Sequence, residues 1–288
     1  MIWSGDNPAH IQSTARLLAE GRLLGFPTET VYGLGADAGN EDAVMAIYAA
    51  KGRPTDHPLI VHIAEVDDAR HFADPIPDFA LRLMKAHWPG PLTLILPRRE
   101  GVAGASAAGQ ANIGLRCPSH PVAQALLRAA RELGVRGVSG PSANRFGRVS
   151  PTRSEHVASE FGHELNVLDG GPCQVGIEST IIDCTRGRPV LLRPGMLDVD
   201  TLTGSAGQAV LSPVRAETEL NQATPKASGT LASHYAPSAR LRLLTVEAMD
   251  QAAQPMSLPQ RARVGVWSFR PPVATGLAWR PMPTDPAL

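Results

Sequence analysis

The sequence has little cysteine and few aromatic residues. Its three cysteines, Cys117, Cys173 and Cys184, are odd in number and form no CxxC pair. This pattern argues against a disulfide framework or a zinc site, so we expect three reduced, mostly buried thiols. Aromatic side chains make up only 5% of the chain. Stacking platforms of the kind that bind single-stranded RNA are therefore scarce.

The chain also lacks an excess of charge and any long apolar run. Its 27 Lys and Arg residues balance 27 Asp and Glu residues, which argues against wholesale binding to nucleic acid or membranes. Any anion site must therefore come from local clustering. No apolar segment approaches the roughly 18 residues of a membrane span, and the N-terminus does not resemble a signal peptide. We therefore expect a cytoplasmic protein.

Two common enzyme motifs are absent. There is no G-x4-G-K-[ST] loop for phosphate and no G-x-S-x-G hydrolase elbow. Gly33-x-Gly35-x-x-Ala38 resembles a dinucleotide fingerprint, but the helix expected after it opens with Glu41 and Asp42. Two carboxylates would oppose a pyrophosphate at that helix N-terminus, so we do not favour a Rossmann cofactor site.

Short apolar runs alternate with helical patterns along most of the chain. Helices are expected over residues 8–21 and 40–51 with Asn7 and Asn40 as N-caps, over 78–87 and 121–133, and over 152–161 from a Thr152-x-x-Glu155 capping box. Strands are expected over 22–26, 59–63, 92–96, 112–116, 135–139, 167–168, 180–183 and 190–192, with an exposed loop over 101–111. This alternation predicts an open α/β sheet flanked by helices.

Composition divides the chain into three parts. Residues 1–211 form the main domain, and the proline-containing segment 212–238, with little apolar periodicity, is interpreted as a linker. Residues 239–288 form a small α/β domain, with a β-α-β fragment over 241–244, 246–253 and 264–269. The proline-rich tail from residue 270 is expected to lack regular structure. About fifty residues is near the lower limit for an independent core, so this domain should lean on the first.

Basic and hydroxyl side chains recur in or beside turns at strand ends. The basic ones are Lys51, Arg53, Arg116, Arg145, Arg148 and Arg193, and the neutral donors are Ser142, Asn144, Ser150 and Ser179. Each alone is typical of a solvated surface or a simple turn. Brought together, they would form a concave site for carboxylate or phosphate. His57 and His62 are five residues apart and would point to opposite faces of a strand, which makes them a poor metal pair.

Seven motifs in register resemble one known family. They are Pro27 to Gly35 (PTETVYGLG), Lys51 to Leu59 (KGRP-x3-PL), Gly114 to Pro118, Pro141 to Asn144, Glu178 to Thr180, Leu192 to Gly195, and His234 to Pro237. Together, over about residues 11–237, they resemble the YrdC family of threonylcarbamoyl-AMP synthases. The resemblance implies an open twisted mixed sheet for a catalytic domain over residues 1–211. It also implies a linker that acts as a lid over residues 212–238, followed by a small and possibly partial C-terminal domain.

The resemblance also implies roles for individual residues. On the L-threonine side it places Thr30, His62, Gly140, Ser179 and Arg116, which would pair with the substrate carboxylate. On the ATP side it places Lys51, Arg53, His57, Asn112, Ser142, Asn144, Ser150, Arg193 and His234. Lys51 and Arg53 would neutralise charge during catalysis. His57 stands where some relatives carry Asn, and residues 229–233 depart from the family pattern, which puts the lid contacts in doubt.

The implied reaction joins ATP, bicarbonate and L-threonine into threonylcarbamoyl-AMP and pyrophosphate for tRNA modification. It needs Mg²⁺, carried with ATP rather than held by a dedicated metal site, and the product would pass to downstream tRNA threonylcarbamoyl transfer machinery. Glu29 could act as a base or bind the metal. Two alternatives remain open. One is an RNA-binding module that uses the same basic concavity, although we expect at most weak direct RNA binding. The other is a carbamoyl-transfer enzyme similar to the related domain of hydrogenase maturation factors.

Overall fold

The computed structural model describes residues 1–220, 224–227 and 239–282. Contacts divide the chain into two compact units, Met1–Ala236 and Pro237–Leu288. The predicted His234 contact over the nucleotide lies outside the described residues.

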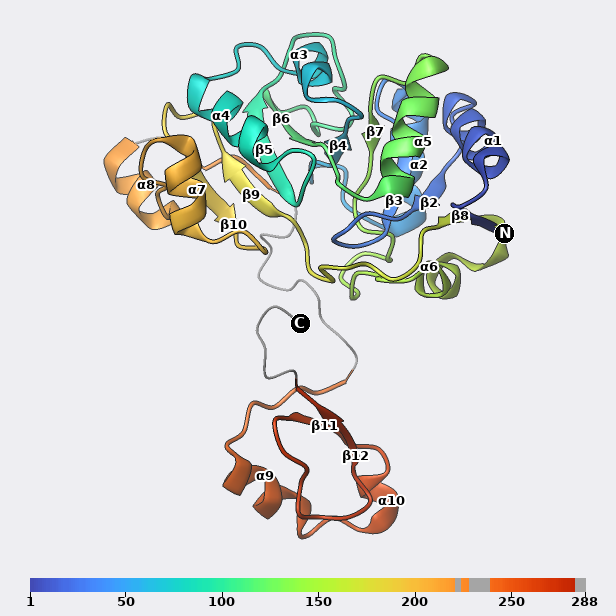
Figure 1. Cartoon of the computed structure of the whole chain (residues 1–288), viewed down its shortest axis with the longest axis vertical. Helices are drawn as coiled ribbons and strands as arrows, with labels where there is room; N and C mark the ends of the chain where they lie inside the picture. The colour runs from blue at the N-terminus through green and yellow to red at the C-terminus, as the bar shows by residue number, and fades with distance from the viewer. Residues whose placement is uncertain (221–223, 228–238, 283–288) are drawn as a thin grey trace. The chain divides into compact units, whose positions relative to one another are not determined.

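A mixed sheet forms the centre of the first unit (Figure 1). Its strand order is β1-β8-β2-β3-β7-β4-β6-β5-β9-β10. The strands are β1 (Ile2–Ser4), β2 (Leu24–Phe26), β3 (Gly33–Asp37), β4 (Ile60–His62), β5 (Leu92–Pro97), β6 (Asn112–Arg116), β7 (Val138–Ser139), β8 (Asn166–Asp169), β9 (Thr180–Asp183) and β10 (Val190–Arg193). The sheet contains parallel pairs such as β4–β6 and β5–β9 and antiparallel pairs such as β5–β6. The expected open mixed α/β sheet is confirmed.

Helices cover both faces of this sheet. They are α1 (Pro8–Ala19), α2 (Glu41–Lys51), α3 (Ala69–Phe72), α4 (Asp78–His87), α5 (Pro121–Glu132), α6 (Ser154–Phe161), α7 (Val199–Ala206) and α8 (Pro213–Leu220). Val167 packs in a core cluster with side chains of α2 and α6, whereas Leu168 packs in a cluster with those of α1 and α5. Neighbouring residues of a strand point to opposite faces, so these two helix pairs lie on opposite sides.

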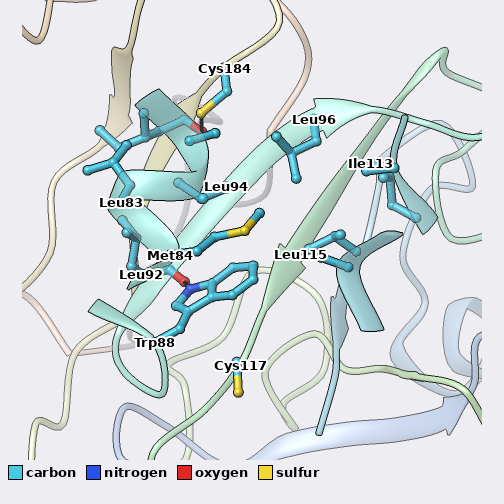
Figure 2. Packing of buried hydrophobic residues seen from close by; sticks show 14 of the residues in the cluster. Leu83, Met84, Trp88, Leu92, Leu94, Leu96, Ile113, Leu115, Cys117 and Cys184 are labelled. Carbon is cyan, nitrogen blue, oxygen red and sulfur yellow. Dashed lines mark hydrogen bonds between the residues drawn. The ribbon is translucent and has the colours of Figure 1, made fainter. Parts of the chain in front are cut away.

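The largest apolar cluster lies between α4 and the strands β5 and β6. Figure 2 shows Leu83, Met84 and Trp88 packed beside Leu94 and other side chains of these strands. The Trp88 indole donates a hydrogen bond to the Leu92 carbonyl at 2.7 Å, so its polar edge is satisfied within the core. This cluster packs β5 and β6 against α4, next to the end of β6 that carries Arg116.

Several local predictions are confirmed by cap geometry. The side chain of Asn7 accepts from the Ala9 amide at 3.0 Å, and that of Asn40 accepts from the Ala43 amide at 3.1 Å. The predicted capping box at Thr152 is wrong, because α6 begins after Arg153, which makes no side-chain cap bond.

The three cysteines are free, with Cys117 and Cys184 buried.

The glycine-rich stretch after Tyr32, which is not among the expected strands, forms β3. In β3, Gly33 and Gly35 pair with β2, and a Cβ atom on either would come within 2.7 or 2.9 Å of a neighbouring side chain. Phe26 occupies this space against both glycines, so the glycines serve close packing. The strand expected over residues 135–139 shortens to β7, and β1, α3 and α7 were not predicted.

The segment 101–111 is not the exposed loop that we expected. Ala103, Ser106 and Ala107 are buried within it. The Ser106 hydroxyl lies 2.6 Å from that of Ser139. The backbone carbonyl of Ser106 accepts a hydrogen bond from the Leu59 amide at 2.8 Å. Small side chains let this turn-rich segment pack closely on the sheet, which a reading of glycine and alanine as loop residues misses.

Three further expectations about the C-terminal part are wrong. The stretch 212–220, read as the start of a linker, contains α8, whose Ala216 packs against Val190 and Leu211. In the second unit, α9 (Val246–Ala253) is confirmed and α10 (Leu258–Arg261) is additional. Residues 241–244 form no strand, and β11 (Gly265–Ser268) pairs in parallel with β12 (Ala278–Pro281), inside the tail expected to be irregular.

Candidate active site

A pocket opens where several strands of the first unit end. It has roughly 450 Å³ of space between its walls, part of it open to solvent. Its lining consists of Thr28, Val31, Gly33, Arg53, Ile60, His62, Arg116, Gly140, Pro141, Ser142, Glu178, Ser179 and Arg193. Seven of the predicted site residues therefore meet here, namely Arg53, His62, Arg116, Gly140, Ser142, Ser179 and Arg193.

Strand register explains why two of these residues meet. In the parallel pair β4–β6, His62 and Arg116 are direct partners at the C-terminal ends of both strands. The next strand, β7, runs antiparallel to β4 and is followed by Gly140, where a Cβ atom would lie 2.9 Å from Nδ1 of His62. A side chain at position 140 would therefore push on the His62 ring, so glycine keeps this wall of the pocket open.

Arg116 is held by three neighbours. One terminal nitrogen lies 2.7 Å from a carboxylate oxygen of Glu29, in a pair whose side chains are both 4% exposed. The other donates to the Thr30 hydroxyl at 2.8 Å, and Nε donates to the Gly90 carbonyl at 3.3 Å. Glu29 also accepts from the Ser119 amide at 3.2 Å and does not line the pocket. Glu29 therefore pairs with Arg116 and is not itself part of the pocket lining.

Burial controls the charge of His62. Desolvation, with a further contribution from Arg116, lowers the pKa of His62 to about 3. The ring is therefore neutral at physiological pH and contacts Phe26 edge to face, with a centroid separation of 5.5 Å. Its Nδ1 is buried and has no hydrogen-bond partner among the described residues. A neutral ring in a pocket wall can exchange hydrogen bonds with a ligand without adding charge.

Arg193 forms another part of the pocket wall. A register irregularity between Leu191 and Arg193 shifts the pairing of β10 with β9, so that Arg193 pairs with Ile181. Nε of Arg193 donates to the Ser179 carbonyl and a terminal nitrogen donates to the Ser179 hydroxyl, both at 3.0 Å. The Ser179 hydroxyl also lies 2.8 Å from that of Thr93. The bulge and these bonds fix the guanidinium beside the start of β9.

Lys51 and Arg53 come from the C-terminal end of α2. Gly52, in the left-handed conformation with φ 62°, ends the helix and separates the two side chains. Nζ of Lys51 donates to the carbonyls of Ser142 and Asn144. Desolvation and the charge of Arg53 lower the pKa of Lys51 to about 7. Lys51 therefore lies buried behind Ser142, whereas Arg53 lines the pocket itself.

Other predicted residues lie beside the pocket or away from it. Asn144 is buried under Lys51, and Ser150 shares an adjoining hollow with Arg193. His57 packs on Phe146 with ring centroids 5.8 Å apart, and Asn112 lines a separate hollow near Gln110 and Lys226. Neither His57 nor Asn112 is among the residues that line the main pocket.

Two basic residues do not join the cluster. The Arg148 guanidinium pairs with Glu160 at 3.3 Å, and both the backbone amide and Nε of Arg145 donate to the same glutamate. The expectation that Arg145 and Arg148 converge with the other cations is therefore wrong. Both arginines contact Glu160 on α6 instead. Their positions in the sequence, beside a turn, gave no sign of this partner.

The sequence analysis did not predict Glu178 as a site residue, although its carboxylate lines the pocket. It precedes Ser179 in one of the motifs that carry the family resemblance, so a signal was present. Among the described residues, no group of three or more His, Cys, Asp or Glu side chains is placed to hold a metal ion. No helix in the described part of the chain is both long and apolar enough to cross a bilayer.

Fold and pocket together define an α/β protein that gathers arginine, neutral histidine and hydroxyl groups at the strand ends of an open mixed sheet. Comparison with known proteins gives the family. The Sua5/YciO/YrdC model, described as telomere recombination, matches residues 16–195, and the model described as the threonylcarbamoyl-AMP synthase C-terminal domain matches residues 199–285. The chain belongs to the Sua5/YciO/YrdC family, as its motifs suggested.

Individual relatives agree with the family models. The chain is 44% identical to a threonylcarbamoyl-AMP synthase of Bacillus subtilis over 82% of its length and 67% of that protein. It is 44% identical to one of Pyrococcus abyssi over 80% of its length and 66% of that protein. The chain thus spans about two thirds of these longer relatives. The solved structure of P. abyssi Sua5 complexed with L-threonine matches with a TM-score of 0.83 and 36% identity, covering 99% of this chain and 84% of that one.

Proposed function

We propose that the chain condenses L-threonine, bicarbonate and ATP into threonylcarbamoyl-AMP, releasing pyrophosphate and water. The observation that carries this proposal is the convergence of Arg53, His62, Arg116, Ser179 and Arg193 on one pocket. The fold and family are those of proteins named threonylcarbamoyl-AMP synthase. The proposed role of the product is threonylcarbamoyladenosine modification of tRNA.

The two sides of the pocket suit different parts of the substrates. Nδ1 of His62 is buried without a hydrogen-bond partner among the described residues, and Arg116 is buried in its ion pair with Glu29. A buried polar group without a partner costs about 1–3 kcal/mol, so a ligand that bonds to this histidine nitrogen gains that much. A threonine carboxylate would pair with Arg116, and the neutral His62 would contact the rest of the amino acid.

The nucleotide is proposed to lie near Arg53 and Arg193. Both arginines line the pocket, with Lys51 behind Ser142. The reaction needs the threonine nitrogen as a neutral amine, which takes up carbon dioxide or bicarbonate as a carbamate. A carbamate oxygen then attacks the α-phosphorus, and pyrophosphate leaves. This pocket would contribute mainly positioning and neutralisation of charge on the phosphates, since no residue has to become covalently attached.

We propose that Mg²⁺ enters with ATP as part of the substrate. The described residues offer no ready-made metal cage, and magnesium commonly binds through substrate phosphates with one or two carboxylates. We also propose a cytoplasmic location, because ATP, threonine and tRNA are available there, and a downstream enzyme that transfers the threonylcarbamoyl group to tRNA. The alternatives, an RNA-binding module and a carbamoyl-transfer enzyme, are not favoured by the named relatives.

Pyrophosphate release tests the proposal. Purified protein is incubated with ATP and Mg²⁺, and threonine and bicarbonate are each omitted in turn. Release should require both, and the adenylate product should appear in step with pyrophosphate. Release that is independent of threonine, or salt-sensitive RNA binding without ATP turnover, would contradict the proposed reaction.

A further inference from the structure

Glu178 is a carboxylate in a pocket that otherwise gathers positive charge. Among the described lining residues it is the one acidic side chain, and it shares the wall with Arg53, Arg116 and Arg193. Its side chain is 16% exposed. The other glutamate of the site, Glu29, is more deeply buried and lies outside the lining. A ligand in the pocket therefore meets Glu178 and does not meet Glu29.

The contacts of Glu178 hold its carboxylate on the side proposed for the nucleotide. The Ser150 hydroxyl donates to one carboxylate oxygen at 2.8 Å, and a terminal nitrogen of Arg193 lies 3.6 Å from the other. The negative charge of Glu178 also acts on Lys51 and Arg53, raising the pKa of each against the larger lowering by burial. Glu178 thus stands among the cations proposed to meet the phosphates.

This placement poses an electrostatic problem for a triphosphate. A carboxylate close to phosphate oxygens repels them, and the repulsion is strong where solvent is partly excluded. A divalent cation between the two groups changes repulsion into attraction on both sides. Magnesium prefers hard oxygen ligands and commonly binds one or two carboxylates together with substrate phosphates. A carboxylate with a serine hydroxyl beside it offers the same kind of donors.

We propose that Glu178, with Ser150 beside it, is the protein's ligand for the Mg²⁺ that ATP carries into the pocket. The inference rests on the proposed function, because it presupposes that the pocket binds ATP. Glu29, which the sequence suggested as a metal ligand, is already paired with Arg116 at 2.7 Å. The proposed metal ligand is therefore Glu178. The competing occupant, the ammonium group of threonine, is one outcome of the test.

The test compares binding of a non-hydrolysable ATP analogue with and without Mg²⁺ by calorimetry, using the full chain and Glu178→Gln. In the parent protein, Mg²⁺ should tighten binding of the analogue about tenfold or more, the size of one charge-assisted contact. In Glu178→Gln, analogue binding without metal should become tighter because the repulsion is gone, and binding with Mg²⁺ should become weaker. A purely structural role would weaken binding under both conditions alike.

Glu160→Gln is the matched control. Glu160 is 18% exposed and pairs with an arginine at 3.3 Å, outside the pocket lining. Its charge also acts on Lys51, so Glu160→Gln should weaken analogue binding with and without metal alike, and the difference made by Mg²⁺ should persist. Should Glu178→Gln fail to fold, Ser150→Ala removes the neighbouring hydroxyl and should reduce the Mg²⁺ effect part of the way. Direct binding of Mn²⁺ in the presence of the analogue, followed by electron paramagnetic resonance, should weaken in both pocket variants.

Three results would overturn the inference. One is an unchanged Mg²⁺ effect in Glu178→Gln together with weaker threonine binding, which would assign Glu178 to the ammonium group. A second is equal weakening of analogue binding with and without metal. The third is an Mg²⁺ effect that Glu160→Gln abolishes equally. Failure of the parent protein to bind the analogue under either condition would instead contradict the proposed function on which the inference rests.

Discussion

Arg116 reaches the pocket with its orientation already fixed. Its guanidinium contacts Glu29, Thr30 and Gly90, and each contact involves a different nitrogen. An arginine held in this way loses little conformational freedom when it binds a carboxylate, which is how preorganised sites gain affinity. The same arrangement makes the pocket sensitive to changes at this one residue.

Replacing Arg116 with Ala should chiefly weaken threonine binding. Loss of a charge-assisted contact worth about 1.5–3 kcal/mol should raise the threonine KM by tenfold or more, with ATP binding little changed. Because the change leaves Glu29 buried without its partner, the double variant Arg116→Ala with Glu29→Gln serves as the control for misfolding. Steady-state kinetics with each substrate varied separately give the result. Loss of ATP binding with threonine binding spared would reverse the two sides of the site.

Lys51 should make ATP binding depend on pH. Its pKa of about 7 follows from burial and from the charge of Arg53, partly offset by Glu178 and Glu160. Below this pKa the ammonium form attracts phosphate, and above it the neutral amine does not, so affinity should fall as pH rises through about 7. Calorimetric titrations of an ATP analogue across this range, with Lys51→Met as comparison, measure the effect. Identical pH profiles for the two proteins would show that another group titrates.

At the scale of elements, the end of α2 determines where two cations lie. Gly52 adopts a φ of 62° and stops the helix between Lys51 and Arg53, so one side chain is buried behind Ser142 and the other lines the pocket. The sequence Lys-Gly-Arg predicted this helix end because glycine is favoured in the left-handed position after a helix. The directions in which the two side chains point could not be predicted from this local signal, because they depend on the strands and turns packed around the helix end.

Substitution of Gly52 should therefore affect both stability and activity. A Cβ atom here would meet nothing within 4 Å, so Gly52→Ala suffers only from the left-handed backbone, by about 1–2 kcal/mol. Gly52→Asn should cost less, since asparagine adopts this conformation more readily. Urea denaturation of the full chain measures the free energy of unfolding, and pyrophosphate release measures activity. Equal stability of the Ala and Gly proteins would show that the helix end shifts to relieve the strain.

At the scale of the whole molecule, the two units differ in how much apolar surface they bury. All four core clusters found among the described residues belong to the first unit. In the second unit, Trp267 and Phe269 are 74% and 66% exposed, and its sheet consists of β11 and β12. A sheet of two strands is marginally stable at best without packing partners. The expectation that this small region leans on other structure stays a prediction.

Separate production of the two units tests this expectation. Residues 1–236 should unfold cooperatively in urea, because they contain a complete core, whereas residues 237–288 alone should show no cooperative transition. Circular dichroism and intrinsic fluorescence follow both transitions. A cooperative transition in the isolated 237–288 peptide would contradict the expectation, and so would a 1–236 fragment that stays unfolded.

The sequence by itself determined the family, most helices and strands of the first unit, and which arginines and hydroxyls were candidates. Local signals suffice for these because caps such as Asn7 and Asn40 and apolar periodicity act within a few residues. Only the tertiary structure decided which candidates meet. The parallel register of β4 and β6 places His62 beside Arg116. Contacts with Glu160 hold Arg145 and Arg148 outside the pocket. Glu178 lines the pocket, whereas Glu29 does not. These outcomes depend on residues far apart in the chain, whose contacts no short-range pattern encodes.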